Sequence, residues 1–304
     1  IMQARLEGFA SALLGALDDA GRTRVAGELT NLEQTVLARA DLRGFLADTS
    51  LSGVTRANVL SDLLLDKVEA TTRRLAVYAA ARVAAQEVAH AFAELAVMAR
   101  TLSETGALDL AGLSLLAARS RVAGFADALL EDTPIEDFSR IGDELFAWAR
   151  AVETHDDLRR LLLDRDADLD ARLGATSQLL EGRVDATTLA LARFVVEGGR
   201  PRDLVGTLDF LVDFVARAHD WRVARVHSAR ALDDASRRDL TASLTTLTGH
   251  PVELLEVDEA SLLGGVLVEV GDLRLDATTR GRLGVLHDAL AQGHLYDSAL
   301  SSNE

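Results

Sequence analysis

The sequence predicts a mostly α protein with two tandem six-helix-type bundles, produced by an internal duplication, and a small α/β domain at the C-terminal end. Ala, Leu and Arg are abundant among the 304 residues, whereas Pro occurs only 3 times and aromatic residues make up 4%. Ala, Leu and Arg favour helices, so this composition indicates a largely helical chain. A repeat at an offset of 116 residues covers the first two thirds, and after residue 220 the apolar residues alternate as they do in strands. The predicted domains are therefore 1–118, 119–220 and 221–304.

The internal repeat is gapless. Residues 5–14 align with residues 121–130 at seven identical positions of ten, and residues 61–72 align with residues 177–188. Over residues 5–82, 26 of the 78 aligned pairs are identical. Identity over that length favours duplication over coincidence between two amphipathic regions that share Ala and Leu.

Capping residues and apolar periodicity predict the helices of the second copy. Thr133, Pro134 and Glu136 combine a capping hydroxyl, a Pro at the first helical position and a Glu three residues after the cap, which is typical of a helix start. Asp185 is a similar cap, for a helix that ends before a pair of Gly residues. The predicted helices lie at 121–130, 134–152, 156–163, 167–180, 186–197 and 201–219.

The fifth helix of the second copy is apolar around most of its circumference. At 3.6 residues per turn its apolar side chains do not form a single stripe. They are Leu189, Leu191, Phe194, Val195 and Val196. A helix of this kind lies in the centre of a core or is covered by a partner.

The C-terminal domain has a different pattern. In residues 262–276 the alternating Val residues and the turn-forming pair Gly271-Asp272 indicate a β-hairpin. The predicted order is β-α-β-β-β-α. The other elements are a strand at 223–226, a helix at 240–247, a strand at 252–257 and a last helix at 283–290.

Charge and residue types exclude several classes of function. The net charge is −16, from 32 basic and 48 acidic residues, so the chain repels phosphate backbones and anionic lipids. This argues against nucleic acid as a partner and against a membrane surface as the main one. There is no Cys, and the one Lys, Lys67, is not in a phosphate-binding loop, so we expect no thiol chemistry and no direct nucleotide binding.

The candidate sites for chemistry are weak. The acidic run from Asp164 to Asp170 imitates the start of a calcium loop, but Leu169 and Ala175 stand where that loop needs Gly and Glu. A solvated turn is the better interpretation. The 7 His residues are scattered and show no metal-binding spacing. We therefore expect no catalytic residues, no metal and no cofactor.

The stretch from Ser261 to Leu283 closely resembles the C-terminal signature of the delta subunit of F-type ATP synthases, the bacterial counterpart of the oligomycin-sensitivity-conferring protein. The resemblance covers residues 119–290, as a six-helix bundle followed by a small α/β domain. One departure is that the run 257–265 is a residue longer than usual. The matching positions are Leu263, Gly264, Gly265, Gly271, Asp272, Asp276, Arg280, Gly281, Arg282 and Leu283.

The extra bundle at 1–118 is similar to the actinobacterial form of this subunit, in which the N-terminal bundle is duplicated. In mycobacteria that form is fused behind a membrane-anchored b-type stalk segment. The abundance of Ala and Arg beside a single Lys is typical of a GC-rich genome of that kind. The unusual start, Ile1-Met2, would suit the delta part of such a fusion.

The resemblance implies a non-catalytic stator subunit of a proton-translocating ATP synthase. In that family the N-terminal bundle receives the amphipathic N-terminal helix of an alpha subunit between its first and fifth helices, and the C-terminal domain binds the b-type stalk helix. The subunit thereby holds the alpha/beta catalytic head still while the rotor turns. It lies at the cytoplasmic face of the plasma membrane, with any membrane anchor outside this chain. The implied groove residues are Phe125, Leu129, Leu189 and Phe194.

Ordinary core packing is the alternative role for each groove residue. Two other functions are also considered. A helical-repeat adaptor unrelated to ATP synthase would need further repeats after residue 220, where the pattern instead changes to strands. An enzyme would need converging His or carboxylate residues, and the sequence shows no such spacing.

Overall fold

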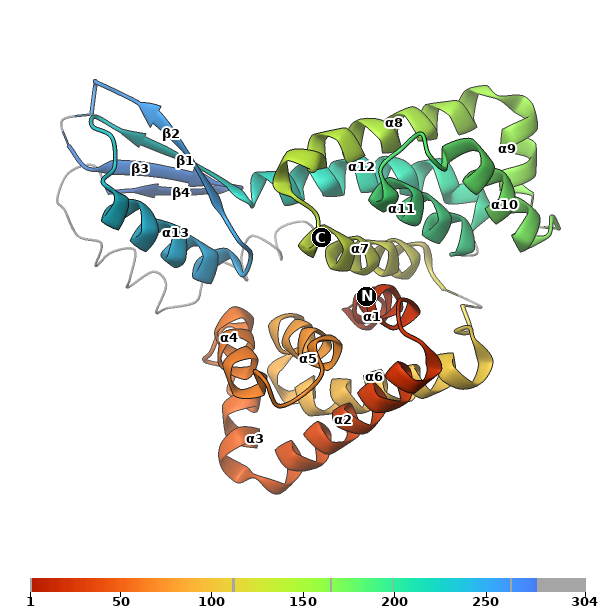
Figure 1. Cartoon of the computed structure of the whole chain (residues 1–304), viewed down its shortest axis with the longest axis horizontal. Coiled ribbons are helices and arrows are strands. Elements are labelled where there is room, and N and C mark those ends of the chain that lie inside the picture. The colour runs from red at the N-terminus through yellow and green to blue at the C-terminus, as the bar shows by residue number, and fades with distance from the viewer. Residues whose placement is uncertain (1, 111–112, 165, 199, 263, 278–304) are drawn as a thin grey trace. The chain divides into compact units, whose positions relative to one another are not determined.

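The computed structural model describes residues 2–110, 113–164, 166–198, 200–262 and 264–277 (Figure 1). The described residues are mostly helical, with a four-stranded sheet near the C-terminal end. Contacts between Cα atoms divide the chain into two compact units. The first comprises Ile1–Leu37, Val68–Leu75 and His90–Ala216, and the second comprises Ala38–Lys67, Ala76–Ala89 and Arg217–Glu304.

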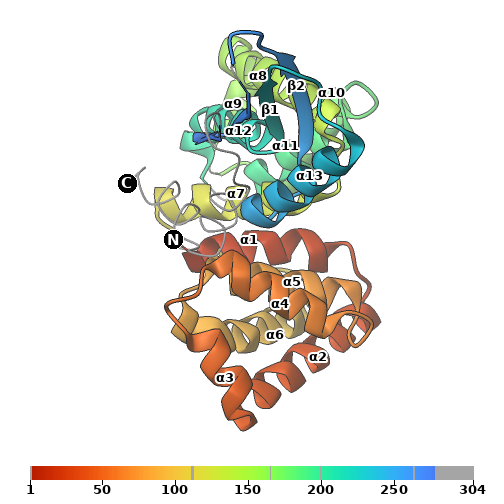
Figure 2. The ribbon, with the colours of Figure 1, turned by 90° about the vertical axis from the view of Figure 1, so that its left-hand side faces the viewer.

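The helices form two sets in the same order (Figures 1 and 2). The first set is α1 (Met2–Gly15), α2 (Asp19–Ala38), α3 (Ala40–Ala47), α4 (Gly53–Leu64), α5 (Ala70–Arg82) and α6 (Val88–Thr105). The second set is α7 (Leu115–Glu131), α8 (Phe138–Thr154), α9 (Asp156–Leu163), α10 (Leu169–Leu180), α11 (Ala186–Glu197) and α12 (Leu204–Asp220). Subtracting 116 from the bounds of α9 and α10 gives the bounds of α3 and α4. The predicted duplication is confirmed.

One hydrogen-bonded cluster in the first copy links its second helix to the start of its fifth. The carboxylate of Glu28, on α2, accepts a hydrogen bond from the backbone N–H of Glu69 at 3.1 Å and another from the hydroxyl of Thr72. Arg24, one turn before Glu28, forms an ion pair with Glu69 at 2.7 Å. Thr72 is fully buried, so Glu28 satisfies a hydroxyl that water cannot reach.

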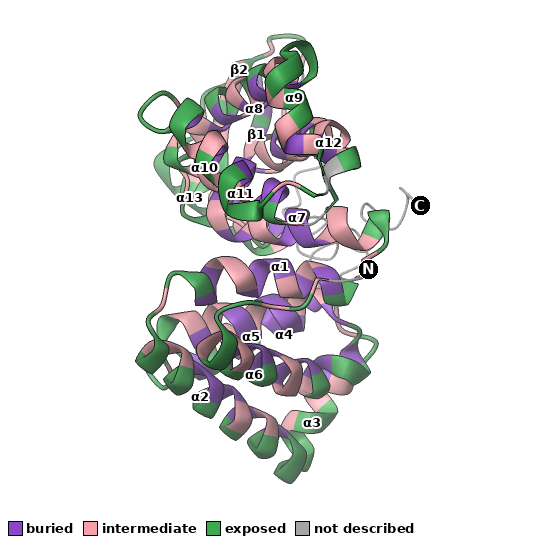
Figure 3. Cartoon of the chain, turned by 90° about the vertical axis from the view of Figure 1, so that its right-hand side faces the viewer, coloured by how far each residue is buried: buried purple, intermediate pink, exposed green. Residues whose placement is uncertain are grey.

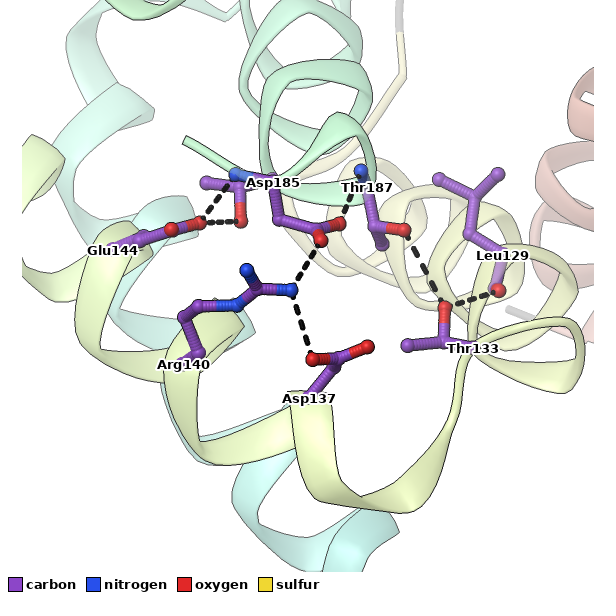
Figure 4. Close-up of polar contacts among 8 residues, drawn as sticks. Leu129, Thr133, Asp137, Arg140, Glu144, Asp185 and Thr187 are labelled. Carbon is purple, nitrogen blue, oxygen red and sulfur yellow. Dashed lines mark hydrogen bonds and ion pairs between the residues drawn. The ribbon is translucent and has the colours of Figure 1, made fainter. Parts of the chain in front are cut away.

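The second copy contains the same cluster 116 residues later (Figure 4). Glu144 accepts hydrogen bonds from the backbone N–H of Asp185 at 2.9 Å and from the hydroxyl of Thr188 at 2.6 Å, and Arg140 pairs with Asp185 at 2.7 Å. Thr188 is fully buried, as Thr72 is in the first copy. The repeat has therefore kept individual hydrogen bonds as well as helix boundaries.

The predicted helix start at Thr133 and Pro134 is wrong in detail. A 3-10 turn, Ile135–Asp137, comes first, and α8 begins only at Phe138. Pro134 itself is extended, with a ψ of 141°. Thr133 does not cap the helix, because its hydroxyl donates to the carbonyl of Leu129 at 2.8 Å. The Thr133 hydroxyl therefore satisfies a carbonyl in the last turn of α7 and not an N–H group of α8.

The C-terminal sheet is built from β1 (Val223–Ser228), β2 (Glu253–Asp258), β3 (Val266–Val270) and β4 (Leu273–Asp276), in the order β2-β1-β3-β4. β1 pairs with β2 in parallel, and α13 (Asp234–Thr248) connects them, whereas β3 is antiparallel to both β1 and β4. α13 covers one face of the sheet (Figure 1), and the core between them consists of Ala224, Val226, Leu240, Leu244, Val252, Val268 and Val270. The predicted strands, helix and hairpin are confirmed. The predicted last helix, 283–290, lies outside the described residues.

We expect a chain truncated after residue 220 to keep the helices of both copies. The removed part contains all four described strands and α13, while the clusters of Glu28 and Glu144 lie within the remaining part. The truncated chain should therefore give a stronger helical circular dichroism signal per residue than the full chain. The alternative outcome is a loss of helical signal, because the second compact unit groups residues 38–67 and 76–89 of the first copy with the C-terminal domain. Loss of helical signal on truncation would contradict the predicted domain boundaries.

Candidate partner-binding groove on the second helical copy

The groove residues predicted from the sequence come from α7 and α11. α7 begins after Ser114, whose side chain accepts a hydrogen bond from the N–H of Ala117. α11 begins after Asp185, whose carboxylate accepts from the N–H of Thr187 at 2.8 Å, so the predicted cap is confirmed. Figure 4 shows this carboxylate between that N–H and the guanidinium of Arg140. The contacts fix the start of α11 relative to α8.

The structure brings two of the four predicted residues into direct contact. The rings of Phe125 and Phe194 are stacked, with centroids 3.7 Å apart and planes at 12°. Phe194 is 4% exposed, whereas Phe125, Leu129 and Leu189 are half-buried. Phe194 therefore supports Phe125 from below, and the three half-buried side chains are the ones that a partner can contact.

Hydroxyl groups connect the ends of α7 and α11 near Leu129 (Figure 4). The Thr133 hydroxyl, which donates to the carbonyl of Leu129, lies 3.4 Å from the Thr187 hydroxyl. Thr187 is two residues before Leu189 on α11. Leu129, near the C-terminal end of α7, and Leu189, near the N-terminal end of α11, therefore lie in the same part of the bundle.

Arg121 is a site residue that the sequence argument missed. It is 3% exposed, and its guanidinium lies 4.2 Å from the centre of the Phe194 ring, where a cation is attracted to the face of the ring. Burial lowers the pKa of Arg121, and the carboxylates of Glu7 and Glu197 oppose that shift. Its Nη1 nitrogen is buried without a hydrogen-bond partner among the described residues. The identity of Arg5 and Arg121 in the repeat was the signal that could have revealed it.

The first copy differs at the equivalent positions. Phe9 corresponds to Phe125 but is fully buried, and Arg73 corresponds to Leu189. The position that holds the accessible, apolar Leu189 in the second copy thus holds a charged Arg in the first. Only the second copy presents Phe and Leu side chains together at the surface of its first and fifth helices.

The predicted signature residues surround the β3–β4 hairpin where they are described. Gly271 has a φ of +54°, and a Cβ there would lie 2.5 Å from the Trp221 ring, so the turn requires Gly. Gly264 and Gly265 also have positive φ, Asp272 follows Gly271 in the turn, and Asp276 ends β4. Leu263, Arg280, Gly281, Arg282 and Leu283 lie outside the described residues.

Metal ligands and membrane-spanning helices are two further features that bear on the class of site. Within the described ranges, no group of three or more His, Asp or Glu side chains is arranged to hold a metal ion. None of the described helices combines the length and the apolar character needed to cross a membrane.

Comparison with known proteins finds similarity to ATP synthase delta subunits in each case. The family model described as ATP synthase delta (OSCP) subunit matches residues 122–290. A protein named ATP synthase subunit delta from Nocardia farcinica is 30% identical over 286 residues, which is 94% of this chain and 95% of that protein. One of the same name from Streptomyces avermitilis is 33% identical over 83% of this chain and 94% of its own length. One from Corynebacterium jeikeium is 38% identical over 50% of this chain and 56% of its own length.

Proposed function

The chain belongs to the ATP synthase delta (OSCP) subunit family and is a peripheral-stalk subunit, and from this premise we propose that it is a non-catalytic link between the alpha/beta head and the b-type stalk. The observation that carries the proposal is the family match, which runs from α7 through the C-terminal sheet in one stretch. The match thus covers both parts that the proposal assigns to the link, the helical bundle for the head side and the α/β region for the stalk side. The link lies at the cytoplasmic face of the plasma membrane.

On the head side, the groove on α7 and α11 receives the N-terminal helix of an alpha subunit. Phe125, Leu129 and Leu189 are half-buried apolar side chains that a partner helix would cover fully. Residues 119–220 carry 13 basic and 21 acidic residues, a net charge of −8, against 11 and 14, a net charge of −3, in residues 1–118. A net negative charge on the copy that carries these residues favours an amphipathic helix with basic residues and speeds its association.

On the stalk side, the C-terminal sheet offers the face opposite α13. Strand alternation places Leu255 on that face, since Leu254 packs against the core below α13. Leu255 is 50% exposed. A b-type stalk helix laid on this face would cover it.

The experiment is to mix the full chain with purified alpha/beta head and to measure co-elution on a sizing column. We expect a stable complex with the intact head and loss of the complex when the N-terminal helices of the alpha subunits are removed. A b-type stalk helix in place of the head tests the stalk side in the same way. Calorimetry of the chain alone with ATP should show no binding. Failure to bind the head, or micromolar ATP binding, would contradict the proposal.

A further inference from the structure

The first helices of the two copies, α1 and α7, lie side by side (Figures 1 and 2) and cross at two Gly residues. A Cβ at Gly8 would lie 1.8 Å from the carbonyl oxygen of Arg121, and a Cβ at Gly124 would lie 1.8 Å from the carbonyl oxygen of Arg5. Residues 8 and 124, like residues 5 and 121, are equivalent in the repeat. The helices therefore cross about a local two-fold axis, at a distance that only Gly permits.

Ion pairs on both sides of the crossing hold it in one orientation. Arg5 pairs with Asp127 at 2.9 Å, and Arg121 pairs with Glu7 at 3.1 Å. The guanidinium groups again belong to equivalent positions of the repeat. Three of the four side chains are less than a quarter exposed, so water competes weakly for these bonds. The contact is a built interface within the chain.

The fifth helices of the two copies break the two-fold symmetry. Arg74, near the start of α5, donates to the carbonyl of Ala128 at 3.1 Å and pairs with Glu131 at 2.8 Å and Asp132 at 3.0 Å. These partners lie at the end of α7. α7 therefore contacts both the first and the fifth helix of the first copy. The second copy has Ala190 at the position of Arg74, and Ala cannot hold α1 in the same way.

Burial follows the same asymmetry. Phe9 is 0% exposed and Leu13 is 9% exposed, while their equivalents Phe125 and Leu129 are half-buried. Figure 3 shows buried stretches along both α1 and α7. In the first copy, Phe9 and Leu13 are therefore too buried to contact an incoming helix. In the second copy, Phe125 and Leu129 both remain accessible.

We infer that α7 occupies the face formed by the first and fifth helices of the first copy, so that each chain takes up one alpha-subunit helix and not two. The inference rests on the proposed function, in which the same face of the second copy receives that helix. Charge adds to the difference, because Arg73 replaces Leu189 in the first copy and would repel a basic helix. The duplicated bundle then serves as an internal partner of the second copy.

Titration calorimetry of the full chain with a synthetic peptide of the alpha-subunit N-terminal helix tests the stoichiometry. We expect one peptide per chain in the wild type, and in the Leu189→Asp variant we expect weakening of that site with no second site remaining. Two peptides per wild-type chain, or one unaffected site in Leu189→Asp, would overturn the inference while leaving the proposed function intact. No binding to the wild-type chain would refute the helix-receiving function as well.

A matched pair of substitutions on α1 tests whether α7 is seated as inferred. Gly8→Ala forces a Cβ against the Arg121 backbone, whereas nothing lies within 4 Å of a Cβ at Gly15 on the same helix. We expect Gly8→Ala to lower the melting temperature by about 5 °C and Gly15→Ala to leave it unchanged or higher. Gly124→Ala should match Gly8→Ala. Equal melting temperatures for Gly8→Ala and Gly15→Ala would show that the two helices are not in contact and would overturn the inference.

Discussion

Replacing Leu189 with Asp is expected to weaken binding of the alpha-subunit N-terminal peptide at least tenfold. Covering an apolar side chain of this size contributes roughly 1.5–3 kcal/mol, and about 1.4 kcal/mol corresponds to a factor of ten. The new carboxylate would also lose water on binding without gaining a partner. Phe125→Asp should have a similar effect, because Phe125 is half-buried above Phe194. Calorimetry or fluorescence anisotropy with the peptide measures both changes.

The matched control is Arg73→Asp, at the equivalent position of the first copy. It should leave peptide affinity within about twofold, because α7 occupies that face and no helix binds there. Phe9 is not a usable control, since it is fully buried and a charge there would unfold the first copy. Circular dichroism must show that Leu189→Asp and Phe125→Asp keep the wild-type helical signal. An affinity that Arg73→Asp changes and Leu189→Asp leaves unchanged would place the groove on the first copy.

Replacing Glu144 with Ala is expected to lower the free energy of unfolding by about 3 kcal/mol, and replacing Glu28 with Ala should cost the same. Each carboxylate accepts one backbone N–H and one hydroxyl of a fully buried Thr. Hydrogen bonds to a charged acceptor contribute about 1.5–3 kcal/mol, and the buried hydroxyl would be left without a partner. Urea unfolding of both variants measures the cost.

Glu144→Gln is the conservative control, because the amide oxygen can still accept one of the two hydrogen bonds, and it should lose less than half as much stability. Glu144→Ala should also weaken peptide binding, since Glu144 holds the start of α11, which carries Leu189 and Phe194. Glu28→Ala should leave peptide binding unchanged. Losses below about 0.5 kcal/mol in both Ala variants would mean that the repeated cluster contributes no net stability.

The sequence by itself determined the helical class, the duplication and the C-terminal hairpin. These depend on local patterns: the offset of 116 residues, the cap at Asp185 and the alternation of Val266, Val268 and Val270. Helix boundaries in the two copies agree to the residue for α9 and α10, because equivalent residues face the same local choices of capping and periodicity. Thr133 shows the limit of such reasoning. Its hydroxyl could cap the next helix or bond to the preceding one, local sequence does not decide between the two, and it donates to the Leu129 carbonyl.

Only the tertiary structure decided in which copy the repeated Phe and Leu side chains stay accessible. Phe9 and Phe125 have nearly the same neighbours in the sequence, yet one is fully buried and the other is not. The difference depends on contacts between residues more than 50 positions apart, such as Arg74 with Glu131 and Gly8 with Arg121. Periodicity reports which face of a helix is apolar, but not which other helix covers it. The packing of α1 on α7 therefore had to come from the fold, where backbone carbonyls and guanidinium groups distant in the chain meet.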